Sequence, residues 1–183
     1  MKLISSNETK LKEFQRIIPS IKIEKGLDLK EVQGTHEEVI IYKSIEAGKG
    51  TVVEDTILII NGEEIVDIKW KISQLKKLHF NTDTIKASWQ VLLGYNTGDT
   101  IEIYKGIVNG IIIPNSIDKG YGFDPYFLPD GSDITLAKLE KEGNKDLYSA
   151  RQKALIKLKH FKYYKKIKIS DIPKWNGKYQ NDN

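Results

Sequence analysis

The chain has 183 residues, of which 39% are hydrophobic and 9% aromatic, and a chain of this size can bury a substantial core. It has no cysteine, which excludes disulfides, thiolate metal sites and cysteine nucleophiles. The net charge is +4, and no apolar run reaches the roughly 20 residues of a membrane-spanning helix or forms the core of a signal peptide. We therefore expect one main domain in the cytoplasm, without a membrane partner.

The first half of the chain alternates apolar runs typical of strands with stretches of helical spacing. Pro19 ends the first helical stretch, and Thr35 with Glu38 has the spacing of a capping box at the start of the second. The predicted strands are 2–4, 21–23, 51–53 and 57–60, and the predicted helices are 8–18, 35–47 and 65–78.

The second half begins with a predicted hairpin, whose strands 85–95 and 100–107 flank the turn residues 96–99. The stretch 120–133 is dense in glycine, proline and aromatic residues and is predicted to be an ordered loop. A last helix is predicted over 147–161. Alternating strands and helices, followed by a hairpin, predict an α/β domain with a mixed sheet.

Basic residues gather at the C-terminal end. Residues 151–183 contain ten basic and two acidic side chains, so they carry a net charge of +8. Lysines interleaved with aromatic residues could contact a nucleic acid backbone. A solvated helix followed by a loose end is the more common reading of such a charge run, and we favour it. We therefore expect a domain over 1–162 and a lysine-rich tail over 163–183 that frays at its end.

Two of four polar clusters lie in the first third of the chain. Ser5, Asn7 and Lys10 follow a predicted strand and begin a helix, where backbone N–H groups and a lysine could bind a phosphate; ordinary helix capping explains them as well. Glu54 and Asp55 interrupt two β-branched runs, and buried carboxylates are costly unless they meet a cation. Mg²⁺ would suit them, and Glu31 could add a ligand; the alternative is a pair of surface carboxylates.

The other two clusters lie in the second half. Tyr121, Phe123 and Asp124 share the glycine-rich loop, where aromatic faces could stack on a flat base and Asp124 could accept from its ring N–H groups. The alternative is a packed loop with these rings in the core. Lys145 and Arg151 flank the start of the last helix and could approach a phosphate or carbonyl oxygen, or simply form a solvated basic helix start.

In their order and spacing, these clusters resemble the inosine triphosphate pyrophosphatase family over Lys2 to about Leu158. The phrase that begins at Gly122 is the most specific of the six that match. The phrases are Ser5-x-Asn7-x-x-Lys10, Asp28-Leu29-x-Glu31-x-Gln33-Gly34, Val53-Glu54-Asp55-Thr56, Ile68-Lys69-Trp70, Gly122-Phe123-Asp124-Pro125-x-Phe127-x-Pro129-Asp130-Gly131 and Ser149-x-Arg151-x-x-Ala154-Leu155.

The resemblance implies an α/β fold with an elongated mixed β-sheet, flanking helices and two lobes around a cleft. It also implies a homodimer. The implied activity is hydrolysis of non-standard purine nucleoside triphosphates (ITP, dITP and XTP) to the monophosphate and pyrophosphate, which keeps these nucleotides out of DNA and RNA. The implied cofactor is Mg²⁺, with Mn²⁺ as a substitute.

The resemblance also implies roles for residues at matching positions. Glu31 and Asp55 resemble the metal ligands, and Asp55 also resembles the group that orients or deprotonates the attacking water. The residues implied to contact the triphosphate or the rest of the substrate are Ser5, Asn7, Lys10, Lys43, Thr56 and Lys69. The residues implied to contact the base are Tyr121, Phe123, Asp124, Lys145 and Arg151.

The chain departs from the family pattern at three places. Ala150 stands where the family usually has a histidine, so one donor to the base is missing. Phe123 stands where tryptophan is common. The turn over 61–65 is shorter than usual, which bears on the position of Lys69.

The three histidines, His36, His79 and His160, lie outside the matched phrases and are interpreted as surface or structural residues.

Two alternatives to the implied function stay open at this point. One is a nucleotide- or RNA-binding protein on the same scaffold, which Ala150 and the basic tail would favour. The other is a pyrophosphatase that acts on modified pyrimidine or other damaged nucleotides.

Overall fold

The computed structural model describes residues 1–24, 29–65, 68, 85–114 and 116–180. Most of the predicted helix over 65–78 lies outside the described residues, as do Lys69 and His79. Within the described ranges, no helix is long and apolar enough to span a membrane.

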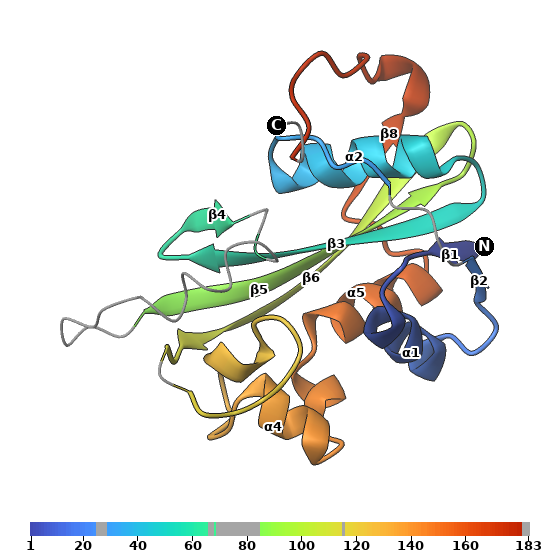
Figure 1. The fold of residues 1–183 in the computed structure, drawn as a ribbon. Helices are drawn as coiled ribbons and strands as arrows, with labels where there is room; N and C mark the ends of the chain where they lie inside the picture. The colour runs from blue at the N-terminus through green and yellow to red at the C-terminus, as the bar shows by residue number, and fades with distance from the viewer. Residues whose placement is uncertain (25–28, 66–67, 69–84, 115, 181–183) are drawn as a thin grey trace. The chain divides into compact units, whose positions relative to one another are not determined.

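The strands form a mixed sheet in the order β2-β1-β3-β5-β6-β7, with β4 paired to β3 and β8 paired to β6 (Figure 1). Strand β1 is parallel to β2 and β3, whereas β4, β7 and β8 pair with their neighbours in antiparallel fashion. The strands are β1 (Lys2–Ile4), β2 (Lys22–Glu24), β3 (Thr51–Ile60), β4 (Glu63–Ile65), β5 (Lys86–Asn96), β6 (Thr100–Ile112), β7 (Phe127–Pro129) and β8 (Lys165–Lys168).

Helices flank the sheet, which confirms the predicted α/β class with a mixed sheet. The described helices are α1 (Glu8–Ile17), α2 (His36–Ala47), α4 (Leu136–Lys141) and α5 (Ala150–Lys159), with short 3-10 turns η1 (Asp124–Tyr126), η2 (Lys145–Tyr148) and η3 (Ile169–Asp171). The two lobes around a cleft stay a prediction.

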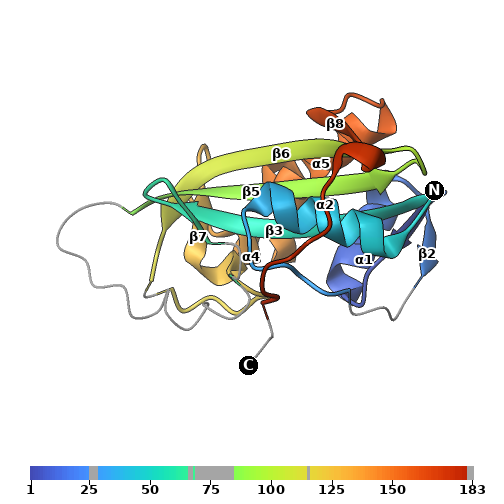
Figure 2. The same cartoon turned by 90° about the horizontal axis from the view of Figure 1, so that it is seen from above.

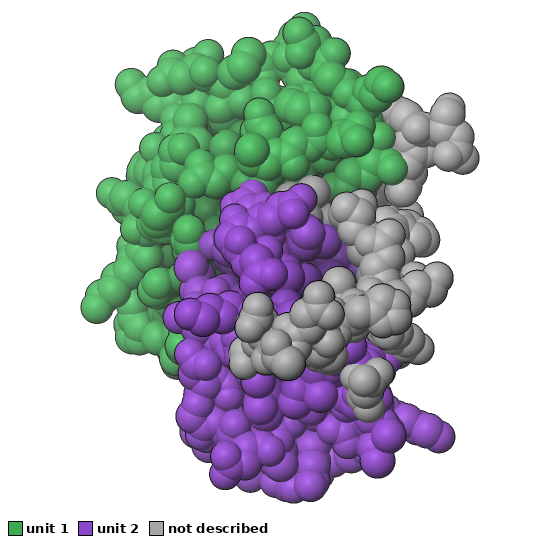
Figure 3. All heavy atoms as spheres, turned by 90° about the vertical axis from the view of Figure 1, so that its left-hand side faces the viewer, with its two compact units in different colours: residues 1–55, 91–106, 151–183 green, residues 56–90, 107–150 purple. Residues whose placement is uncertain are grey.

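The chain divides into two units, which Figure 3 shows in separate colours. Strands β3, β5 and β6 each contribute residues to both. Unit 1 comprises residues 1–55, 91–106 and 151–183, and unit 2 comprises residues 56–90 and 107–150.

In unit 1, α2 packs on one face of the sheet, and α1 and α5 lie on the other face (Figure 1). The predicted capping box begins α2: the Thr35 hydroxyl accepts from Glu38 N, and the Glu38 carboxylate accepts from Thr35 N. These two bonds satisfy backbone N–H groups that the first turn of α2 would otherwise leave without partners. The core under α2 is apolar and consists of Ile4, Ile40, Val53, Leu92, Ile101 and Ile103.

Strand β3 is continuous through Glu54 and Asp55, where two separate apolar runs were expected. Side chains alternate along a strand, so these neighbours point to opposite faces. Asp55 shares the face of Val53, which packs under α2. Glu54 points to the face that carries α1 and α5. The strand continues because each carboxylate meets its own cations, described below.

In unit 2, β6 extends to Ile112, beyond the predicted end at 107. The extension pairs with β7, which lies inside the segment predicted to be a loop. Gly110 permits this pairing, because a Cβ there would collide with the backbone carbonyl of Leu128. The short helix α4 packs beside η1, η2 and β7.

The C-terminal residues differ from the expected loose end. After α5, β8 pairs with β6 in the register Thr100↔Lys168 to Ile103↔Lys165. Ile167, Ile169 and Ile172 pack against the apolar core under α2. Their near-alternate spacing is a strand signal that the surrounding lysines obscured in the sequence.

Candidate active site

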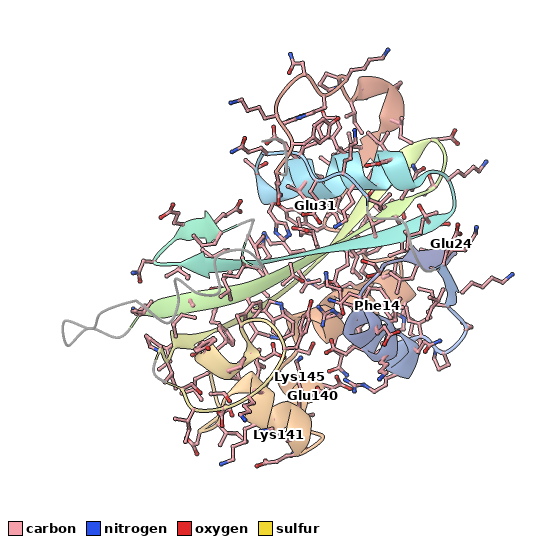
Figure 4. The ribbon with its side chains drawn as sticks, viewed as in Figure 1. Phe14, Glu24, Glu31, Glu140, Lys141 and Lys145 are labelled. Carbon is pink, nitrogen blue, oxygen red and sulfur yellow. The ribbon has the colours of Figure 1, made fainter. Side chains whose placement is uncertain are left out.

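Two carboxylates and two basic side chains meet between α2 and β3 in unit 1; we call Glu31, His36, Lys43 and Asp55 the α2–β3 cluster. Lys43 Nζ lies 2.8 Å from Glu31 Oε1 and 3.7 Å from Asp55 Oδ1. His36 Nε2 lies 3.2 Å from Asp55 Oδ2. Figure 4 labels Glu31 beside α2. The cluster therefore brings together three residues that the sequence analysis selected and one that it did not.

Helical spacing explains why α2 contributes twice to this cluster. His36, Ile40 and Lys43 are four and three residues apart, which places them on one face of the helix. Ile40 is fully buried in the core, so this face looks onto the sheet. The side chains of Lys43 and His36 therefore point toward the sheet, where they contact Asp55.

The contacts in the cluster favour the charged forms of Asp55 and Lys43. Burial alone would raise the pKa of Asp55, but contact with His36 and the positive charge of Lys43 lower it below its usual value. Burial would likewise lower the pKa of Lys43, but the charges of Asp55 and Glu31 raise it. At neutral pH the site therefore contains an anionic Asp55 beside a cationic Lys43.

The donor set suits a divalent cation. The carboxylates of Glu31 and Asp55 approach the same ammonium group, so their oxygens converge on one point where positive charge is stabilised. Mg²⁺ is commonly bound by one or two carboxylates together with substrate phosphate oxygens. Among the described residues, no group of three or more His, Asp or Glu side chains is placed to hold a metal.

His36 is the member of the α2–β3 cluster that the sequence analysis did not select. Its side chain is buried, as a structural residue would be, but its imidazole contacts the carboxylate of Asp55. The signal was present in the sequence, because His36 stands seven residues before Lys43 on a helix whose start Thr35 defines.

The opposite face of β3 carries a second buried ion cluster, centred on Arg151. Its Nε and Nη2 donate to Glu54 Oε2 and Oε1 at 2.6 and 3.0 Å, and its Nη1 donates to Glu13. Lys10 Nζ lies 3.1 Å from Glu54 Oε1. Burial disfavours the charge of Arg151, but Glu54 and Glu13 raise its pKa. In the structure, Arg151 thus bridges α5, β3 and α1, and its contact with a base stays a prediction.

Ser5 and Asn7 shape the junction of β1 and α1. Ser5 Oγ accepts from Asn7 N at 3.1 Å, and Asn7 Oδ1 accepts from Lys10 N at 3.2 Å, which makes Asn7 the cap of α1. The ordinary capping function is therefore present. Phosphate binding by Ser5, Asn7 and Lys10 stays a prediction.

Unit 2 holds a buried ion pair beside aromatic rings. Lys145 Nζ lies 2.6 Å from Asp124 Oδ2, and both side chains are buried. The same ammonium lies 5.8 Å from the ring centroid of Trp89. Figure 4 labels Lys145 near α4. A positive donor is thus held in a fixed place by a carboxylate and an aromatic face.

The two loop aromatics lie in different environments. Phe123 is buried and packs edge-to-face with Trp89 at 5.9 Å and with Phe127 at 6.2 Å. Tyr121 is 56% exposed. Phe123 is therefore a core residue, as the alternative interpretation of the loop expects, whereas Tyr121 is largely exposed. Thr56, half-buried on β3, also belongs to unit 2.

The fold and these clusters define an α/β protein whose buried carboxylates and lysines are suited to binding phosphate and a cation. The model of the Ham1 family matches residues 1–161, and this chain belongs to the Ham1 family.

Relatives and solved structures agree with this assignment. Inosine triphosphate pyrophosphatase of Scheffersomyces stipitis is 32% identical, with 86% of this chain and 95% of the relative covered; that of Yarrowia lipolytica is 34% identical, with 86% and 93% covered. The Ham1 protein of Staphylococcus aureus superposes with a TM-score of 0.72 at 26% identity and covers 88% of this chain and 97% of its own. A HAM1 protein from Coxiella burnetii shares the fold, with a TM-score of 0.65 at 22% identity and coverage of 88% and 98%.

Proposed function

We propose that this chain hydrolyses non-standard purine nucleoside triphosphates (ITP, dITP and XTP) to the nucleoside monophosphate and pyrophosphate. The observation that carries the proposal is the α2–β3 cluster, in which an ionised, buried Asp55 lies beside Lys43 and His36 and near Glu31. Family membership supports it, and so do the names of the relatives.

The cofactor of the proposed reaction is Mg²⁺, for which Mn²⁺ can substitute. Glu31 and Asp55 would hold it, because their carboxylates already converge on a positive charge. When bound, the ion offsets the charge of the phosphates and polarises the reacting phosphoryl group.

The side chains of unit 1 supply positioning and charge, on which phosphoryl chemistry mainly depends. Lys43 and Lys10 offset negative charge on the triphosphate. Asp55 accepts a hydrogen bond from the attacking water and orients it. As an anion, it can also accept the proton of this water. His36 holds the carboxylate of Asp55 in place.

Removal of the imidazole should reveal this role of His36. We expect His36→Leu to lower kcat for ITP roughly 10-fold with little change in KM, since loss of a group that orients a ligand typically costs 10- to 100-fold. His36→Gln, which keeps a donor, should recover part of the rate. The matched control is His160→Gln, at an exposed position. Equal kcat values for His36→Leu and the wild-type enzyme would show that the contact has no role in turnover.

The side chains of unit 2 supply recognition of the base. Lys145, fixed by Asp124, donates to the 6-keto oxygen of hypoxanthine or xanthine. Adenine carries an amino group there, which leaves the donor unpaired at a cost of roughly 1–3 kcal/mol. Tyr121 provides an aromatic contact for the base, and the buried Phe123 supports the loop from the core. ATP is therefore rejected.

Neutralising this donor should weaken use of the preferred substrate. We expect Lys145→Gln to lower kcat/KM for ITP by roughly 10- to 100-fold, the equivalent of one lost charged hydrogen bond, and to lower the ratio of ITP to ATP turnover. Lys138→Gln, on the exposed side of α4, is the matched control. The measurement is steady-state kinetics with ITP and with ATP. An unchanged ratio of ITP to ATP turnover would show that Lys145 does not contact the base.

The proposed function as a whole is tested by pyrophosphate release with Mg²⁺ from ITP, dITP, XTP, GTP, ATP and dUTP. Fast release from ITP, dITP and XTP supports it. Preference for a modified pyrimidine nucleotide would favour the damaged-nucleotide alternative, and bound but uncleaved nucleotide would favour a binding protein.

We further propose that the protein is a cytoplasmic homodimer that does not bind nucleic acid. A stable monomer in light scattering would contradict the dimer.

A further inference from the structure

The last described residues of the chain lie against the segment that carries Glu31; we call residues 172–180 the C-terminal strap. The strap belongs to unit 1 and follows β8 and η3. The model of the Ham1 family ends at residue 161, so the strap lies beyond the matched region. Figure 2 shows it, in red, running beside α2, and Figure 1 agrees.

The strap pairs with the backbone on both sides of Val32. Gln180 N donates to Glu31 O at 2.8 Å, and Gln33 N donates to Lys178 O at 2.8 Å. Val32 and Tyr179 form an antiparallel bridge between these two hydrogen bonds. A single antiparallel β-bridge thereby lies next to Glu31 in the chain.

Side chains fix the strap to α2 and to itself. The Trp175 ring lies 5.1 Å from the ring of Tyr42 on α2, and the Tyr42 hydroxyl donates to Pro173 O at 2.8 Å. Trp175 Nε1 donates to Lys178 O at 3.1 Å. These contacts set the position of Lys178 O, which in turn accepts from Gln33.

The segment that bears Glu31 has no regular secondary structure of its own. Glu31 stands outside the helices and strands, and its carbonyl accepts from the strap. Lys43 and Asp55, in contrast, lie within α2 and β3. A binding group must be held to within about 0.5 Å of its working position, and loops achieve this poorly without support. Asp55 is held by its strand, but Glu31 belongs to no strand. The strap supplies the backbone hydrogen bond that Glu31 does not receive from regular secondary structure.

We propose that the C-terminal strap is a positioning element of the active site, which holds the backbone of Glu31 so that its carboxylate stays directed at the cation site shared with Asp55. This proposal rests on the proposed function, because it takes Glu31 as a ligand of Mg²⁺. It also gives a use to the aromatic residues of the basic tail: Trp175 contacts Tyr42, and Tyr179 lies under Lys30 at 5.4 Å.

The test compares two substitutions at one residue of the full-length chain. Gln180→Pro removes the N–H that donates to Glu31 O, whereas Gln180→Ala keeps it. We expect Gln180→Pro to raise the Mg²⁺ concentration for half-maximal pyrophosphate release from ITP roughly 10-fold, and to accelerate hydrogen exchange at the Gln33 amide. Both variants lose the bond from Gln180 Nε2 to Val32 O at 3.3 Å. Gln180→Ala keeps the backbone N–H, so it should shift both readouts clearly less than Gln180→Pro. Trp175→Ala, which loosens the strap through Tyr42, should shift both readouts in the direction of Gln180→Pro.

The outcomes separate the two proposals. Faster exchange at Gln33 with an unchanged Mg²⁺ requirement would overturn the positioning role while leaving the proposed function intact. If the wild-type chain releases no pyrophosphate, the proposed function fails, and the rise in melting temperature on addition of Mg²⁺ alone becomes the readout. In that case, a smaller rise in melting temperature for Gln180→Pro and Trp175→Ala than for the wild-type protein supports the positioning role of the strap. An equal rise in the wild-type protein and all three variants rejects that role.

Discussion

Asp55→Asn is expected to lower turnover of ITP by roughly 10³-fold, within the range typical of a lost acid–base or water-orienting group, while the nucleotide still binds. The substitution preserves shape but removes the negative charge that lies beside Lys43 and His36. Single-turnover kinetics measure the chemical step, and equilibrium titration with ITP measures binding.

The control for Asp55→Asn is Asp99→Asn, which makes the same change of charge on the exposed turn between β5 and β6. It should turn over ITP at the wild-type rate. Turnover by Asp55→Asn within a few-fold of the wild-type rate would show that Asp55 does not take part in the reaction. Loss of nucleotide binding together with turnover would assign it to binding alone.

Arg151→Met is expected to reduce the free energy of unfolding by about 3–5 kcal/mol, because it leaves the buried carboxylates of Glu54 and Glu13 without their shared cation. For a domain of this size, that corresponds to a fall in melting temperature of roughly 6–20 °C. The measurement is made without nucleotide, so it reports the ion cluster and not any contact with a base.

Arg16→Met, on the exposed side of α1, is the matched control and should shift the melting temperature by no more than about 2 °C. A melting temperature of Arg151→Met equal to that of the control would mean that Arg151 does not hold α5, β3 and α1 together. The proposed base contact would then be its main role.

The adjacent carboxylates of β3 illustrate what could be predicted from the sequence. The pattern left two interpretations of Glu54 and Asp55: buried groups that need a cation, or a pair of surface carboxylates. The structure buries both and places cations beside each of them. Their separation to opposite faces follows from strand alternation. It was missed because the sequence was divided into two strands at that point, and only the cations on each face explain why the strand continues.

His36 and the strap were missed for a different reason. The strap depends on contacts between segments far apart in the chain, such as Gln180 with Glu31, and no local pattern encodes these. His36 shares a helix face with Lys43, but its contact with Asp55 also needs β3 beneath that face. The family resemblance did not help, because His36 lies between matched phrases and the strap lies beyond them. The capping box at Thr35 and the helix that follows it to Ala47, in contrast, are local and were predicted correctly.

The central claim is that the α2–β3 cluster directs cleavage between the α and β phosphates of a non-standard purine nucleotide. Its most direct test is to identify the products formed from ITP and Mg²⁺ by the full-length chain, with Asp55→Asn beside it. We predict inosine monophosphate and pyrophosphate in equal amounts, formed roughly 10³-fold more slowly by the variant. Inosine diphosphate with free phosphate, or equal product from both proteins, would contradict the claim.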